Sequence, residues 1–160
     1  MVTRHINQII GLGILAGIRT SFAPALLSQH FHQHPSAALG DSRLNLLQSE
    51  KAAVITKLFA AFEIVGDKNP LAPNRTGMPQ VLFRIASGAF AGFVLAKAKR
   101  QHTGLGLLVG AASAVAGTFG AFYLRQYING LPGVKDVYVG AAEDLVGIAA
   151  GGLISSGMRK

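Results

Sequence analysis

The chain contains no cysteine and no tryptophan, and few of its residues are charged. Without cysteine there is no disulfide framework, no thiolate metal site and no cysteine nucleophile. Charged residues make up 14% of the 160 residues, whereas the surface of a soluble domain typically has about 25–35%. Half of the residues are hydrophobic, which excludes a disordered chain and disfavours a soluble helical bundle. The composition therefore predicts an integral membrane protein.

One segment is long enough to cross a bilayer without any charge. No Lys, Arg, Asp or Glu lies between Arg100 and Arg125, and a membrane helix needs about 20 mainly apolar residues. Four other apolar segments each carry one or two charges. We expect a single transmembrane domain over residues 1–160 with five helices, at about 6–28, 52–66, 80–96, 103–124 and 137–157. The predicted fold class is all-α, a polytopic membrane helix bundle.

The first apolar segment permits two interpretations. Arg4 and the apolar run behind it look like the start of a signal peptide, with a cleavage site at residues 23–25. Arg19 is unusual just before such a site, and the glycines of this segment suit helix packing, so we favour an uncleaved first helix. With five spans, seven Lys and Arg residues lie on one side and five on the other. This bias predicts the N-terminus outside and the C-terminus inside.

Two short segments resemble each other. Residues 60–66 and 141–147 are identical at four of seven positions. One interpretation is a pair of inverted two-helix repeats around a central third helix, an architecture found in transporters. The other interpretation is that the similarity arose by chance, since small residues are frequent in membrane helices.

Charged residues inside the apolar segments provide the predicted site. A charge at the centre of a membrane helix costs about 2.5–3.5 kcal/mol, so such residues usually face the bundle interior and mark function. Arginines could bind an anionic solute, and carboxylates could bind an ion or relay a proton; alternatively, the two arginines of the apolar segments simply neutralise two of three acids. The predicted substrate- or ion-binding residues are Arg19, Thr20, Glu63, Asp67, Lys68, Arg75, Arg84, Glu143 and Asp144.

Glycines four residues apart recur in the apolar segments. Such pairs form a smooth groove in which another helix can approach closely. They predict packing inside the bundle or in a homo-oligomer, and a dimer is favoured because five thin spans hardly enclose a pathway. The predicted packing residues are Gly13, Gly17, Gly88, Gly92, Gly106, Gly110, Gly147 and Gly151.

Three alternate histidines, His30, His32 and His34, would point the same way in an extended segment and could share a zinc ion. A closed zinc site needs four ligands, and only Asp41 or His102 is available as a fourth. We therefore expect a solvated loop, no metal and no cofactor.

Enzymatic and nucleic-acid functions find little support. Neither a Gly-x-Ser-x-Gly nor a His-Glu-x-x-His motif occurs, so we expect no enzyme, although Lys68, Arg75 and the histidines leave open an enzyme acting on lipid phosphates. The net charge of +8 comes from basic residues at the expected helix ends, and these residues are not interleaved with aromatic residues. This pattern favours membrane lipids, through anionic head groups, as partners.

Two motifs together resemble a known family. They are Gly13-x3-Gly17-x-Arg19-Thr20-x3-Pro24 and Glu63-x3-Asp67-Lys68-x-Pro70-x2-Pro73-x-Arg75. They resemble a bacterial family of glycine-rich integral membrane proteins of unknown function, over most of the chain but not the histidine-bearing loop. The resemblance implies a small multi-spanning protein of the bacterial inner membrane and no established activity.

From the residues, we expect a small transporter or channel for an ion or a small polar or anionic solute, with a charged site near the membrane midplane. The alternative is a structural protein that packs with lipids or protein partners through its glycine faces.

Overall fold

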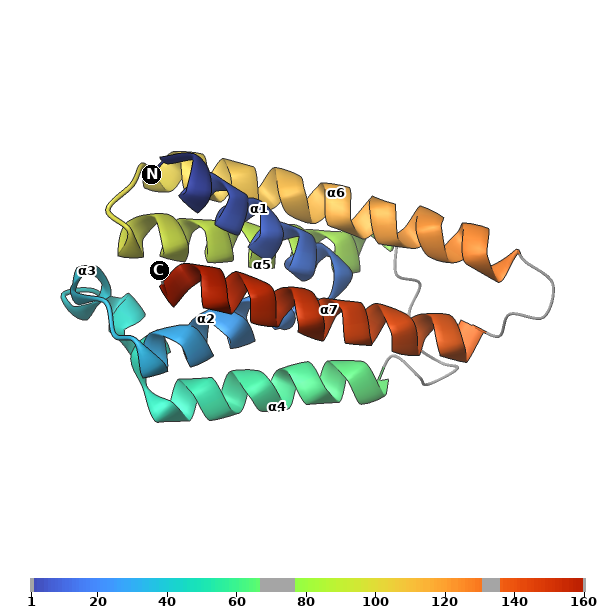
Figure 1. Ribbon diagram of the computed structural model, residues 1–160, viewed down its shortest axis with the longest axis horizontal. Helices are drawn as coiled ribbons and strands as arrows, with labels where there is room; N and C mark the ends of the chain where they lie inside the picture. The colour runs from blue at the N-terminus through green and yellow to red at the C-terminus, as the bar shows by residue number, and fades with distance from the viewer. Residues whose placement is uncertain (1, 67–76, 131–135, 160) are drawn as a thin grey trace.

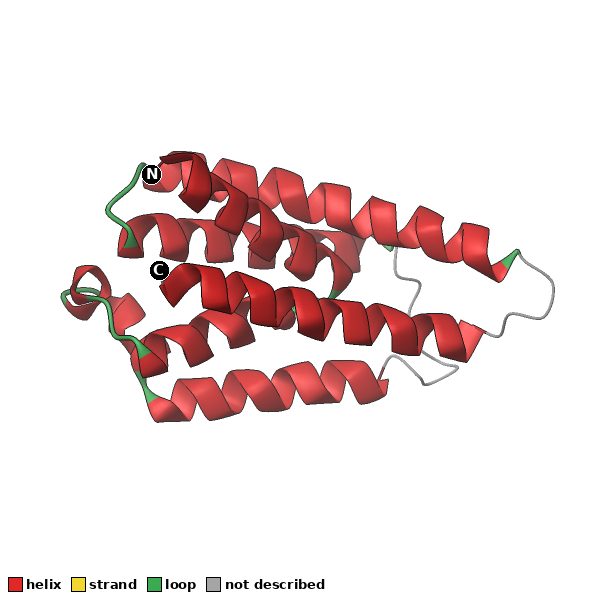
Figure 2. Cartoon of the chain, in the orientation of Figure 1, coloured by secondary structure: helices red, strands yellow, loops and turns green. Residues whose placement is uncertain are grey.

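The chain is a bundle of helices, as the composition predicts. A computed structural model describes residues 2–66, 77–130 and 136–159, and every regular element in these ranges is helical (Figure 2). The elements are α1 (Val2–Ile18), α2 (Phe22–Gln33), α3 (Ala37–Gly40), the 3-10 helix η1 (Arg43–Gln48), α4 (Glu50–Gly66), α5 (Met78–Ala98), α6 (Thr103–Asn129) and α7 (Asp136–Arg159).

Three of these helices are long and apolar enough to cross a membrane. They are Met78–Ala98, Thr103–Asn129 and Val139–Met158, and the apolar part of α1, His5–Ile18, is shorter. Large hydrophobic side chains cover the outside of the bundle, and Phe62, Tyr127 and Leu153 each remain more than 70% exposed. A surface of this kind is unfavourable in water but matches a lipid environment. The chain is therefore an integral membrane protein.

The first expected span is not one helix. Helix α1 ends at Ile18, and α2 begins at Phe22 and runs back toward the end of the bundle at which α1 starts (Figure 1). Gly17 lies against Thr118, which is the sixteenth of the 27 residues of α6. The expected span at 6–28 is therefore wrong, because the chain turns back about halfway through the bundle.

Helices α4 to α7 then alternate in direction, and the two ends of the chain lie at the same end of the bundle (Figure 1). The Lys99 Nζ donates a hydrogen bond to the Met158 carbonyl at 3.2 Å, which ties the end of α5 to the end of α7. The expectation of termini on opposite sides is therefore wrong, because the α1–α2 hairpin adds a reversal. Five basic residues of η1, of the start of α4 and of the end of α5 with its following turn lie at this shared end: Arg43, Lys51, Lys97, Lys99 and Arg100.

The expected inverted two-helix repeat is also not found in the described helices. Inversion would require both helices of one copy to run opposite to their counterparts. Helices α4 and α7 do run in opposite directions, but α1 and α6 run in the same direction, because Gly13 lies at Gly110 and Gly17 at Thr118.

Helix α6 packs against both α1 and α5, and glycines make both contacts. A Cβ atom on Gly13 would lie 2.6 Å from the Gly110 carbonyl oxygen, and one on Gly88 would lie 2.6 Å from the same atom. Distances below about 3.0 Å are essentially never seen for real Cβ atoms, so only glycine permits this approach. Six of the eight predicted packing glycines lie at such helix crossings: Gly13, Gly17, Gly88, Gly92, Gly106 and Gly110.

The other two predicted packing glycines, Gly147 and Gly151 of α7, face side chains of the hairpin. Gly147 lies against the ring of Phe22, and Gly151 against Leu26 and Leu15. Helix α7 therefore packs on the hairpin through side chains, not backbone on backbone.

Replacing Gly110 by alanine is expected to lower the free energy of unfolding by about 1–3 kcal/mol, because the new methyl group overpacks the α5–α6 crossing. The matched change Gly104→Ala in the same helix meets nothing within 4 Å. It is expected to be neutral or to stabilise by up to about 1 kcal/mol through helix propensity. Unfolding in mixed detergent micelles measures both. Equal changes in the free energy of unfolding for the two variants would contradict the close packing of α6 at Gly110.

The Lys and Arg bias predicts that the shared end faces the cytoplasm. Single cysteines in this cysteine-free chain test it: Gly40→Cys and Gln101→Cys lie at the shared end, and Gly130→Cys lies at the other end. A membrane-impermeant maleimide added to intact cells should label only the Gly130 variant, and added to inverted vesicles only the other two. Labelling of all three from one side would refute the topology.

Candidate functional site

The turn between α1 and α2 is the candidate site. We call residues 17–21 the tip. A break in a helix inside a membrane exposes backbone N–H and C=O groups, and each costs several kcal/mol if it has no partner. Each of the four helices around the tip contributes at least one polar side chain to it. These are Glu63 of α4, Arg84 and Ser87 of α5, Thr118 of α6 and Asp144 of α7.

The carboxylate of Glu63 binds the amino end of α2. Its two oxygens accept hydrogen bonds from the backbone N–H groups of Thr20 and Ser21, both at 2.8 Å. Ser21 is the N-cap residue of α2 and makes no side-chain cap of its own. A negative charge is favoured at a helix N-terminus, where unpaired N–H groups and the helix dipole point outward. Glu63 therefore occupies what is otherwise a ready-made anion-binding site.

The carbonyl groups of the tip are bound from the other side. The Arg84 Nη1 donates to the Gly17 carbonyl at 3.0 Å, and the Ser87 hydroxyl donates to the Thr20 carbonyl at 2.6 Å. The Thr118 hydroxyl lies 3.2 Å from the Gly17 carbonyl and 2.8 Å from that of Ala114, so these two acceptors share it. Arg84, Ser87 and Thr118 are all buried. The break in the helix is thus hydrogen-bonded on both its donor and its acceptor sides.

Arg19 joins the tip to two further helices. Its Nε and Nη2 lie 2.9 and 2.6 Å from Asp144 Oδ1 on α7, and its Nη1 donates to the Glu63 backbone carbonyl of α4 at 3.3 Å. The two charged side chains are only 4% and 10% exposed. This is a buried ion pair, whose desolvation penalty is offset only by close geometry and further hydrogen bonds.

The structure brings together five of the predicted site residues, which are Arg19, Thr20, Glu63, Arg84 and Asp144. Among the residues that the structure describes, the cluster contains two arginines and two acids. Residues Asp67, Lys68 and Arg75 lie outside the described residues.

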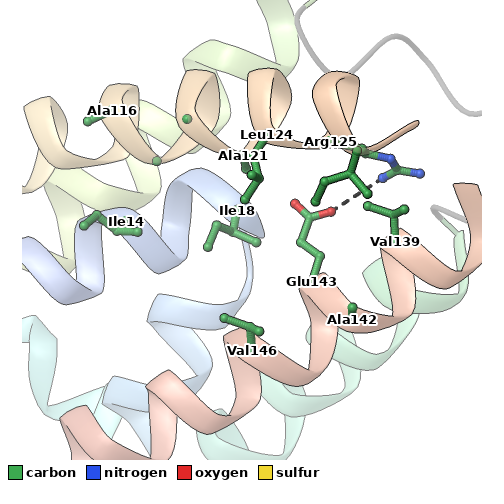
Figure 3. Close-up of a pocket in the computed structure, with 13 residues that line it drawn as sticks. Ile14, Ile18, Ala116, Ala121, Leu124, Arg125, Val139, Ala142, Glu143 and Val146 are labelled. Carbon is green, nitrogen blue, oxygen red and sulfur yellow. Dashed lines mark ion pairs between the residues drawn. The ribbon is translucent and has the colours of Figure 1, made fainter. Parts of the chain in front are cut away.

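Glu143 does not belong to this cluster. It faces Arg125 of α6, with Nη1 and Oε2 3.5 Å apart (Figure 3). The count of two arginines against three acids omitted Arg125, which ends the uncharged segment. Adjacent residues of a helix point in different directions, so Glu143 and Asp144 could not both face the tip.

Sequence reasoning missed two residues of the site, Ser87 and Thr118. Both are small hydroxyl residues in apolar helices, where they commonly bond to the backbone of their own helix. Nothing in their local sequence indicates that they face a broken neighbour.

The histidines do not form an extended ligand set. Helix α2 includes His30 and His32, and residues two apart in a helix do not face each other. The rings of His30 and His34 stack with centroids 5.1 Å apart, while His32 Nδ1 lies 3.3 Å from the Gln48 carbonyl. Within the described ranges, no three His, Asp or Glu side chains gather as metal ligands.

Replacing Asp144 by asparagine is expected to destabilise the protein by about 3–5 kcal/mol, because it removes the negative charge that lies against the buried Arg19 guanidinium. The double change Arg19→Met with Asp144→Leu removes both charges and is expected to be neutral or stabilising. The exposed change Glu50→Gln serves as a control without effect. Unfolding in mixed micelles measures all three. A double variant as unstable as Asp144→Asn would show that the pair itself is required for folding.

Comparison with known proteins adds a family but no activity. No curated protein and no solved structure matches the chain. The family described as a domain of unknown function, DUF4126, matches residues 6–155, a range that includes the tip and every side chain bound to it. The chain belongs to the DUF4126 family.

Proposed function

We propose that the protein is a small membrane transporter whose binding site is the tip and whose substrate is a small anionic solute. The observation that carries this proposal is the α2 amino end, which lies at mid-depth in the bundle and is bound by a carboxylate. In secondary transporters, discontinuous helices place such half-helix amino ends near the bilayer midplane, where they bind anionic groups of the substrate.

The donors of the tip suit an anion. The Arg19 guanidinium and the N–H groups of Thr20 and Ser21 now bind Asp144 and the Glu63 carboxylate. A carboxylate or another small oxyanion has the same acceptor geometry and can replace either side chain. The protein's own acids thus hold the site closed until a substrate exchanges with one of them.

The charge balance of the cluster predicts that a proton accompanies the solute. The described residues of the cluster include two arginines and two acids, and an added anion would bring a further negative charge into a region of low dielectric, at a cost of several kcal/mol. A proton that enters together with the anion offsets that charge. We therefore favour co-transport of the anion with a proton over a channel for ions.

The alternative, a structural protein that packs with partners through its glycine faces, is less favoured. The six glycines at helix crossings face α1, α5 and α6 within the bundle, so they are already used inside one chain. The proposal therefore depends on the charged tip, with the glycines as its scaffold.

The setting of this transporter is proposed with it. The resemblance and the basic shared end support a bacterial inner membrane with lipids as partners. We further propose a homodimer, because one thin bundle hardly encloses a pathway. We propose neither enzymatic activity nor a cofactor, nucleic acid or metal for the tip.

The test is solute flux into proteoliposomes loaded with a pH-sensitive dye, with gradients of acetate, lactate, nitrate and phosphate applied in turn. We expect the wild type to acidify the lumen faster than protein-free liposomes with at least one of these anions. The variant Arg19→Met with Asp144→Leu is expected to lose about 90% of that flux or more, because one charge-assisted interaction with the anion corresponds to about tenfold in affinity.

The control is Glu50→Leu with Lys51→Met, which removes one negative and one positive charge from exposed positions at the start of α4. It is expected to retain the wild-type rate. Circular dichroism and gel filtration establish that each variant is folded. The proposal fails if no anion produces flux in the wild type, or if the folded tip variant transports as fast as the control.

A further inference from the structure

A pocket beside the tip plays no part in the proposed function. It has a volume of about 580 Å³ and lies between the second half of α6 and the first half of α7, with the last turns of α1 as its floor (Figure 3). Its walls are almost entirely apolar. They include Ile14, Ile18, Ala121, Leu124, Val139 and Val146.

The pocket extends over one half of the membrane. Its lining on α6 runs from Ala116, two residues before Thr118 at mid-depth, to Ile128, close to the end of the helix. The twelve steps between these residues, at about 1.5 Å each, correspond to about 18 Å. The hydrocarbon core of a bilayer is about 30 Å thick, so the pocket has the length of one leaflet.

Part of the pocket wall carries no bulky side chain. The wall is formed partly by Gly117, Gly120 and Ala142, and on Gly120 a Cβ atom would meet nothing within 4 Å. Such a slot fits a single extended chain of methylene groups.

One ion pair forms the polar part of the pocket. Arg125 and Glu143 face each other from α6 and α7, with side chains 19% and 13% exposed (Figure 3). Their Nη1 and Oε2 atoms lie 3.5 Å apart, so a ligand phosphate would share the guanidinium with Glu143. Arg125 lies one turn before the end of α6 and about 10 Å beyond Thr118, and a long arginine side chain can extend its charged end further toward the head groups. A guanidinium group suits phosphate, which it can bind through two parallel hydrogen bonds.

We propose that this pocket binds a membrane phospholipid with an anionic head group. One acyl chain lies along α1, α6 and α7, and the phosphate binds Arg125. The apolar lining, the length of about one leaflet and the arginine near the outer end of the pocket together favour this ligand. The site is independent of solute binding at the tip, so either proposal can fail without the other.

The test uses the absence of tryptophan from the chain. One substitution, Leu124→Trp, places a pocket reporter in the pocket wall, and a matched substitution, Leu105→Trp, places a surface reporter on the exposed side of the same helix near its other end. Each variant is reconstituted in phosphatidylcholine bilayers with increasing amounts of dibrominated phosphatidylglycerol, and separately with dibrominated phosphatidylcholine. Bromine quenches tryptophan on contact, so the two titrations give the relative affinity of each lipid at each position.

Phosphatidylglycerol is expected to be preferred at the pocket reporter by about fivefold, the effect of one arginine near an anionic head group. No preference is expected at the surface reporter. Adding Arg125→Gln with Glu143→Gln to the pocket reporter removes both charges without leaving either one buried alone, and the preference should disappear. Adding Gly120→Leu fills the pocket and should reduce quenching by both lipids, whereas Gly152→Leu, also on an open surface, should not.

Two results would overturn the site. Equal preferences at the pocket reporter and the surface reporter would show only the general lipid layer around the protein. Quenching at the pocket reporter that is insensitive to Gly120→Leu would show that the acyl chain lies outside the pocket. The same substitutions are also combined with the surface reporter, where unchanged quenching confirms that the bundle is intact.

Discussion

The structure depends on one requirement, which is that every backbone polar group inside a membrane must have a partner. The chain creates this difficulty itself by ending α1 at Ile18 and reversing direction halfway through the bundle. The tip then needs acceptors for its N–H groups and donors for its carbonyls. Helices α4 to α7 each supply at least one polar partner, so the tip determines where these helices carry their polar residues. In a continuous helix without this break, Glu63, Arg84 and Asp144 would no longer share the tip as a binding partner.

Glycine packing makes this arrangement possible. Because α6 touches both α1 and α5 backbone to backbone, a side chain as short as that of Thr118 can reach the Gly17 carbonyl of a neighbouring helix. Helix α7 is held differently, by side chains of the hairpin against Gly147 and Gly151. It therefore stands farther from the second half of α6, and the apolar pocket fills the difference. The same contrast in packing produces a closed polar tip on one side of α1 and an open apolar slot on the other.

The sequence alone could predict the helical class, the apolar spans and five of the residues at the tip, because these follow from composition and from the cost of charge in lipid. The sequence also contains one indication of the hairpin formed by α1 and α2. Pro24 lies in the first turn of α2, where proline is favoured because no N–H partner is needed. The same proline lies within the small-residue pattern of a cleavage site, and that second interpretation obscures the start of a helix. The pairing of Arg125 with Glu143 could not be predicted, because it depends on how α6 and α7 are rotated against each other, and no local pattern states this.

The ion pair at the tip is the strongest argument for function over architecture. A hairpin tip can be satisfied with neutral groups, and Ser87 already does so for the Thr20 carbonyl. Arg19 and Asp144 instead bury two charges, and apolar residues of similar volume often replace such a pair without loss of stability. A purely structural tip would gain little from them. An exchangeable anion site needs a fixed cation, and it needs an acid that can leave that cation when a substrate arrives. Arg19, Asp144 and Glu63 together have these properties, which is why we assign transport to the tip.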